Sequence, residues 1–169
     1  MTAQSVRKSL IVVMLVLCAS CALAQAPPAA SLYLIPIGPP ISVETAKKAA
    51  AAALAEARKN GWLQVVAVVD PGGTLVYYEK MDNTELAAAD LAIDKARSSV
   101  LYKRPTKAFQ DGLEKGGVNL RILGLKAAVP VEGGLPIIVD GKLVGAIGLS
   151  GDTTEHDGQC AAAGLAALK

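Results

Sequence analysis

The chain has 169 residues, of which 52% are hydrophobic and only 4% are aromatic, and its formal net charge is +2 at pH 7. Arg7 and Lys8 lie near the start, and without them 15 basic side chains balance 15 acidic ones. Balanced charge with a single Trp and a single Phe argues against a nucleic-acid surface, which needs basic patches and stacking aromatics.

Residues 1–24 have the pattern of a secretory signal peptide. A basic pair at residues 7–8 precedes an apolar run at residues 10–17, and Ala-Leu-Ala at residues 22–24 matches an A-x-A cleavage site. The apolar run is too short to cross a bilayer. We therefore expect a mature chain that begins at Gln25 and is periplasmic or secreted.

The three cysteines leave one alternative to this prediction. A lipid anchor would use Cys18 or Cys21, but neither is preceded by the residues that such a site needs. Cleavage before Gln25 would leave Cys160 alone, so no intrachain disulfide could form. Cys160 lies among alanines without a basic neighbour, and we expect a buried small side chain rather than a nucleophile.

Residues 25–41 are rich in Pro and Ala and have no hydrophobic period. They are expected to form an extended arm that leads into a single domain over residues 42–169. The apolar side chains at residues 32–37 would be unusual on the surface of a monomer. We therefore expect a homo-oligomer in which the arm crosses to a neighbouring subunit.

The domain is expected to begin with a helix and a pair of strands. Ser42 can cap a helix over residues 44–59, and Gly61 can supply the left-handed residue that ends it. Residues 63–70 and 74–81 are rich in β-branched and aromatic side chains. They flank a Pro-Gly-Gly turn, so an antiparallel pair is expected.

Two helices are expected next, over residues 86–102 and 105–115, with Pro105 in the first turn of the second. Residues 116–125 then have the composition of a loop. A third strand is expected at residues 127–131, where apolar side chains resume.

The most ordered pattern lies between residues 131 and 151. Apolar runs at residues 136–139 and 143–149 flank Asp140-Gly141, which favours a two-residue hairpin turn with positive φ. A last helix is expected over residues 153–168. The elements together predict one α+β domain with a five-stranded, mainly antiparallel sheet and packed helices.

Common catalytic and cofactor motifs are missing from the sequence. It contains neither a glycine-rich phosphate motif nor a G-x-S-x-G nucleophile elbow. His156 is the single histidine, and no residues with zinc-site spacing accompany it. The alternative to a ligand role is that His156 is simply a solvent-exposed residue at the start of the last helix.

Two regions of the middle helices could bind a ligand. Lys95 lies in the small-residue segment IDKARSS, which favours a groove, although charges on a helix usually face solvent. Arg104 and Thr106 flank Pro105 at a helix start, where free N–H groups favour an anion.

The hairpin predicts a third candidate region. Antiparallel pairing carries Gly133 and Gly134 towards Gly148, close to the start of the last helix. We expect a shared pocket there, approached by Lys95 or Thr106. The alternative is that these glycines only allow close packing of a helix.

Several ordered motifs occur between residues 42 and 168: AVVDPGG, KMD, AxxKA, RPT, VEGGLPI, and VDGKLVGAIGLSG followed by xxxD. Together they resemble the GlcG/HbpS family of haem-binding or haem-degrading-like proteins, which is related to the C-terminal domain of PduO-type proteins. The resemblance implies a mixed α/β fold and assembly into tetramers or octamers. For some members it implies binding of haem or other tetrapyrroles.

The motifs and the resemblance together give the expected site. Thr106 or His156 is the candidate ligand for haem iron, and the absence of C-x-x-C-H implies haem held without covalent linkage. Lys80 stands where many relatives have Arg, which weakens two-pronged carboxylate recognition there. The expected ligand-binding residues are Lys95, Arg104, Thr106, Glu132, Gly133, Gly134, Ser150, Gly151 and Asp157.

The sequence therefore predicts a secreted or periplasmic protein that binds haem or a related tetrapyrrole, without a confident catalytic residue. One alternative is an enzyme in which Lys95 and Glu132 do acid-base work on a small carboxylate or aldehyde. Another is an accessory subunit of a periplasmic oxidoreductase, which would have a redox partner.

Overall fold

The computed structural model describes residues 34–169. The expected signal peptide and most of the expected arm lie outside this range. No helix within it is long and apolar enough to cross a membrane. The main elements in chain order are α1 (Val43–Asn60), β1 (Val65–Val69), β2 (Leu75–Lys80), α2 (Ala88–Tyr102), α3 (Lys107–Glu114), the 3-10 helix η2 (Gly117–Gly124), β3 (Gly134–Val139), β4 (Lys142–Ser150) and α4 (Thr154–Ala166).

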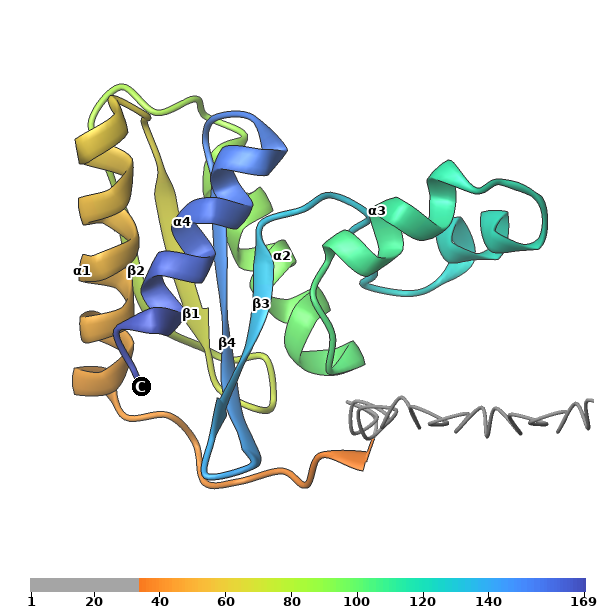
Figure 1. Cartoon of the computed structure of the whole chain (residues 1–169), viewed down its shortest axis with the longest axis horizontal. Helices are drawn as coiled ribbons and strands as arrows, with labels where there is room; N and C mark the ends of the chain where they lie inside the picture. Colours follow the sequence, from red (N-terminus) through yellow and green to blue (C-terminus); the bar gives the residue numbers. More distant parts are fainter. Residues whose placement is uncertain (1–33) are drawn as a thin grey trace, which may run out of the picture.

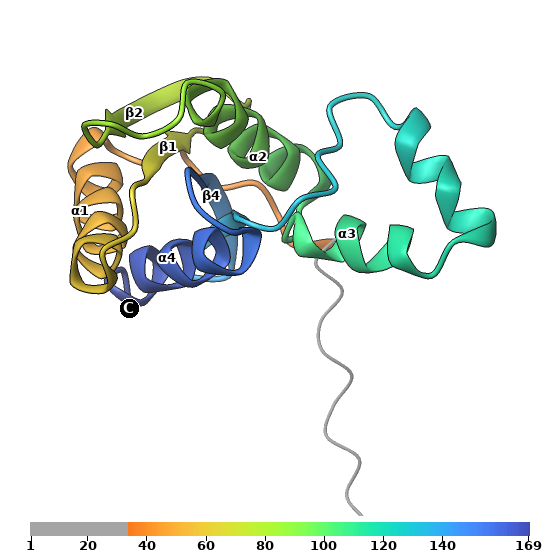
Figure 2. The same cartoon turned by 90° about the horizontal axis from the view of Figure 1, so that it is seen from above.

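The core is a sheet of four antiparallel strands in the order β2-β1-β4-β3, covered by helices on both faces. Helices α1 and α4 lie side by side on one face and α2 lies on the other (Figures 1 and 2). Every residue of β1 is buried, as expected of a central strand with both faces covered. The predicted α+β class is confirmed.

The prediction of a fifth strand at residues 127–131 is wrong. Ala127 has a φ of 62°, which breaks an extended run at its start. The Val129 N–H donates to Ser98 Oγ on α2 at 2.9 Å, and Pro130 has no N–H to give to a neighbouring strand. This segment therefore crosses α2 instead of joining the sheet.

Local turn and cap predictions are confirmed. Ser42 Oγ accepts a hydrogen bond from the Thr45 N–H at 3.2 Å, and Gly61 ends α1 with a φ of 75°. Asp140 and Gly141 have φ values of 49° and 72°, as a two-residue hairpin turn requires. The expected approach of Gly134 to Gly148 is confirmed, and a one-residue register shift between Ile137 and Ile138 places the two residues directly opposite each other.

Residues 107–125 form a projection outside the three layers made by the sheet and the helices on its two faces. It consists of α3 and η2, which extend away from the sheet (Figures 1 and 2). The segment predicted as loop at residues 116–125 thus contains a 3-10 helix. Only Phe109 is buried in α3 and no residue is buried in η2. Its exposed apolar side chains are Val118, Leu120, Leu123 and Leu125.

Candidate functional site

A buried ion pair lies at one end of the sheet. Lys95 Nζ on α2 is 2.6 Å from Asp157 Oδ2 on α4, and the two side chains are 1% and 2% exposed. Gln64, just before β1, donates from Nε2 to Asp157 Oδ1 at 2.7 Å. Since α2 and α4 cover opposite faces of the sheet (Figure 2), the pair joins the two outer layers.

The electrostatics of this cluster follow from its burial. Burial raises the pKa of the Asp157 carboxyl above its ordinary value, while Lys95 and Gln64 oppose part of that rise. Gln64 Oε1 is buried and accepts no hydrogen bond within residues 34–169. The Lys95–Asp157 pair therefore carries its charges in a nearly dry interior.

The loop at Gly133 and Gly134 closes over this pair. A Cβ on Gly133 would lie 3.0 Å from Lys95 Nζ and 2.7 Å from the Leu149 carbonyl oxygen, and the φ of this residue is 128°. A Cβ on Gly134 would collide with the Lys95 carbonyl oxygen. Atoms of α2, β4 and α4 thus fill the space in front of Gly133, and the α2 backbone and Thr106 fill the space in front of Gly134.

Thr106 fastens the same loop. Its Oγ1 accepts a hydrogen bond from the Gly134 N–H at 2.9 Å, and its own N–H donates to the Gly134 carbonyl at 3.0 Å. The residue is fully buried. The structure therefore gathers Lys95, Thr106, Gly133, Gly134 and Asp157, five of the predicted site residues, into one closed cluster.

The hydroxyl of Ser150 and the backbone of Gly151 lie at the end of β4. Ser150 is 2% exposed. Gly151 has a φ of 141°, and a side chain there would collide with the Leu63 carbonyl oxygen. Ser150 is thus buried as the last residue of β4, and Gly151 lies close to the Leu63–Gln64 backbone.

Glu132 lies at the rim of the cluster. A Cβ on Gly158 of α4 would collide with its carboxylate, which is 3.5 Å from Lys107 Nζ on α3. Its N–H donates to Gln110 Oε1 at 2.9 Å. Acid-base work by Lys95 and Glu132 would need both groups to face one substrate, whereas the Lys95 ammonium is buried and bound to Asp157.

His156 lies on the outside of α4. Its ring stacks on Trp62 with a centroid separation of 3.8 Å, and Nδ1 is 2.7 Å from Asp152 Oδ1. This contact lowers the pKa of the Asp152 carboxyl. His156 is therefore partnered on the surface of the core and does not join the buried cluster.

Cys160 is the free cysteine of the described chain and is buried in α4. Burial raises the pKa of its thiol to about 12. A thiol that stays protonated is a weak nucleophile. The prediction of a buried, small apolar role is confirmed.

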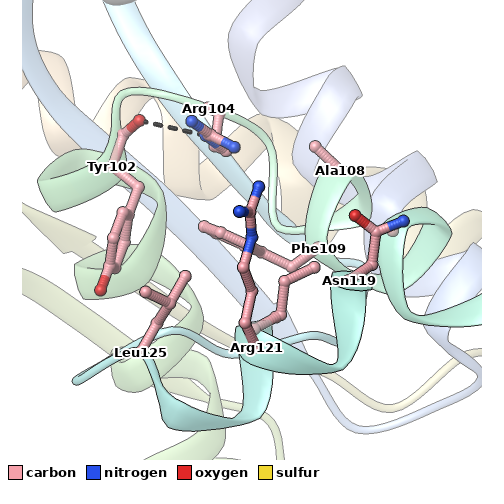
Figure 3. Close-up of a pocket in the computed structure, with 9 residues that line it drawn as sticks. Tyr102, Arg104, Ala108, Phe109, Asn119, Arg121 and Leu125 are labelled. Atoms are coloured by element: carbon pink, nitrogen blue, oxygen red, sulfur yellow. Dashed lines mark hydrogen bonds between the residues drawn. The ribbon is translucent and has the colours of Figure 1, made fainter. Parts of the chain in front are cut away.

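A pocket of about 390 Å³ lies between the end of α2 and the projection. The Arg104 guanidinium stacks over the Phe109 ring at 5.2 Å, and Arg121 of η2 points into the same space (Figure 3). Tyr102 forms part of the wall. Of the predicted site residues, only Arg104 lines this pocket.

Phe109 and Arg121 line the pocket but are not among the residues that the sequence predicts for the site. A helix start at residues 105–107 was visible, but nothing in the sequence shows that η2 folds back towards α3. Apolar residues at 120, 122 and 123 were a weak signal, since loops that face solvent on all sides rarely carry them.

Comparisons with known proteins agree with this fold. The family model described as "Haem degrading protein HbpS-like" matches residues 41–166. Protein GlcG of Escherichia coli K12 is 37% identical over 110 residues, which cover 65% of this chain and 81% of GlcG. The corrinoid adenosyltransferase PduO of Salmonella typhimurium is 30% identical over 150 residues, 80% of this chain but only 44% of PduO.

Two solved structures show the same architecture. The PduOC–haem complex is 28% identical with a TM-score of 0.69 and covers 76% of this chain and 94% of that chain. A double mutant of HbpS from Streptomyces reticuli is 31% identical with a TM-score of 0.71 and covers 86% of this chain and 99% of that chain. The chain belongs to the HbpS-like family, together with GlcG and the related C-terminal domain of PduO.

Proposed function

We propose that this protein binds haem or a related tetrapyrrole without covalent linkage, in the pocket between α2, α3 and η2. The observation that carries the proposal is that two guanidinium groups, those of Arg104 and Arg121, line one pocket, where Arg104 lies over the Phe109 ring. The crystal structure of the similar PduOC protein as a haem complex supports it.

The chemistry of the pocket suits an anionic ring system. Arginine forks bind carboxylates such as propionates through two parallel hydrogen bonds. The apolar side chains of Ile122 and Leu125 in the pocket wall can contact the face of a planar ligand, whereas the Phe109 ring is buried beneath Arg104. No acidic residue lines the pocket in the described chain. Its volume of about 390 Å³ lies within the usual range for ligand sites.

The proposed location is the periplasm or the exterior of the cell. The support is the leader pattern at residues 1–24, which the described residues do not include. Processing at Gln25 would give a mature protein that meets haem outside the cytoplasm.

Titration of haemin into the purified protein is expected to shift the Soret band saturably at micromolar concentration. Arg121→Glu replaces a cation that faces the ligand with an anion, so the Kd is expected to rise at least about tenfold. Lys48→Glu is the matched control, since it makes the same charge change on the exposed surface of α1. A titration without saturation, or equal loss in both variants, would contradict the proposed function.

We also propose a homo-oligomer of the tetramer or octamer size, held partly by the projection. Val118, Leu120 and Leu123 are 74%, 55% and 69% exposed, and a monomer rarely leaves such a cluster in water. Exposed Leu34 and Ile37 of the arm add to the apolar surface.

Light scattering is expected to give several times the monomer mass. Leu120→Asp with Leu123→Asp should lower that mass, because a carboxylate would be buried in the interface. The monomer fold should persist, since both side chains are exposed and circular dichroism can check it. A monomeric wild-type protein would show the oligomer proposal to be wrong.

A further inference from the structure

The proposed pocket supplies contacts for carboxylates and for a ring, but few of its side chains are of the types that coordinate iron. Haem iron in proteins is held by His, Cys, Met or a Tyr oxygen. No His, Cys or Met side chain lines the pocket within residues 34–169, and Tyr102 is the one residue of these four types that does.

Tyr102 is unsuited to iron coordination. Its hydroxyl donates a hydrogen bond to the Lys126 carbonyl oxygen at 2.6 Å. The Tyr102 oxygen is therefore held against the backbone of Lys126, a residue that does not line the pocket. Figure 3 shows the hydroxyl at the end of the ring away from Arg104.

The two iron ligands expected from the sequence lie elsewhere. Thr106 is fully buried, and its Oγ1 accepts the Gly134 N–H at 2.9 Å. His156 is on α4, stacked on Trp62 and bound through Nδ1 to Asp152. Neither residue lines the pocket that holds Arg104 and Arg121.

We infer that this pocket selects its ligand by its carboxylates and ring face and not by its metal. The ligand class is then a planar tetrapyrrole with free carboxylates, whether or not it holds iron. This inference rests on the proposed function, because it concerns the same pocket. Contacts to the porphyrin carboxylates and coordination of the iron would then contribute separately to haem affinity.

Three probes test it on the full chain: haemin, metal-free protoporphyrin IX, and the dimethyl ester of protoporphyrin IX. Absorbance and porphyrin fluorescence give each Kd. The acid porphyrin is expected to bind within about threefold of haemin. The ester is expected to bind at least about tenfold more weakly, because its carboxyl groups can no longer make charge-assisted hydrogen bonds.

Variants show which residue causes the difference in Kd between the acid and the ester porphyrin. Arg121→Met should narrow the difference between acid and ester, because it removes one guanidinium from the pocket, whereas Lys48→Met on α1 should leave the difference unchanged. Arg121 is exposed, so both variants are expected to unfold at the wild-type temperature.

The outcomes are distinguishable. Saturable haemin binding with a much weaker metal-free porphyrin would overturn the inference and leave the proposed function standing. So would loss of haemin affinity alone in His156→Gln. Failure of both haemin and the acid porphyrin to bind would contradict the proposed function and the inference with it.

Discussion

Replacing Lys95 by methionine is expected to lower the free energy of unfolding by about 3–5 kcal/mol, because it leaves Asp157 buried without its counter-charge. The Asp157 side chain is 2% exposed, and Gln64 Nε2 alone cannot neutralise it. Urea unfolding followed by circular dichroism measures the change. A double variant, Lys95→Met with Asp157→Leu, should regain much of the loss, since no unpaired charge then remains.

The matched control is Lys107→Met on α3. Lys107 Nζ is 2.8 Å from Asp111 Oδ1, but these side chains are 49% and 45% exposed. Removal of such a surface pair is expected to leave the urea midpoint close to that of the wild type, because solvent screens the two charges. Equal losses for Lys95→Met and Lys107→Met would mean that burial does not set the strength of the Lys95–Asp157 pair.

Gly148→Ala is expected to destabilise the fold by about 3 kcal/mol, the upper end for overpacking, because the colliding atoms belong to the backbone. A Cβ at this position would overlap the Ala92 carbonyl oxygen and lie 2.6 Å from the Ala96 nitrogen. Helix α2 would have to move away from β4 to admit one methyl group. Thermal unfolding compares the variant with the wild type.

Gly124→Ala serves as the control for glycine replacement. A Cβ on Gly124 meets nothing within 4 Å, and its φ is not positive. The change is expected to stay within about 0.5 kcal/mol, as is usual for an exposed site without special contacts. If Gly148→Ala lowered the stability as little as Gly124→Ala, the close packing of α2 on β4 would not constrain the fold.

The features that the sequence predicts well are set by neighbouring residues. Asp140-Gly141 needs only its own positive φ angles to form the hairpin turn, and Ser42 caps α1 through a residue three positions away. Both depend on local backbone chemistry. The same turn brings Gly134 near Gly148, while a one-residue register shift between Ile137 and Ile138 sets their exact pairing.

The features that the sequence could not predict depend on distant partners. Residues 127–131 have strand composition, but the hydroxyl of Ser98, which is 31 residues from Val129, takes the N–H that a ladder would need. The small neighbours of Lys95 predict a side chain in a ligand groove, whereas the side chain is buried against Asp157, which lies 62 residues away in the sequence. Nothing in the sequence indicates a role for Gln64, because its hydrogen bond to Asp157 forms only when β1 and α4 come together.

The ion pair between the outer layers also sets an order for folding. Lys95 and its counter-charge Asp157 are 62 residues apart in the sequence. Until α4 brings Asp157 to the end of the sheet, burial of the Lys95 amine is unfavourable, so α2 cannot settle fully on the sheet. A chain that ends before Asp157 thus keeps a lysine without its counter-charge and an open sheet end, where proteases can attack it.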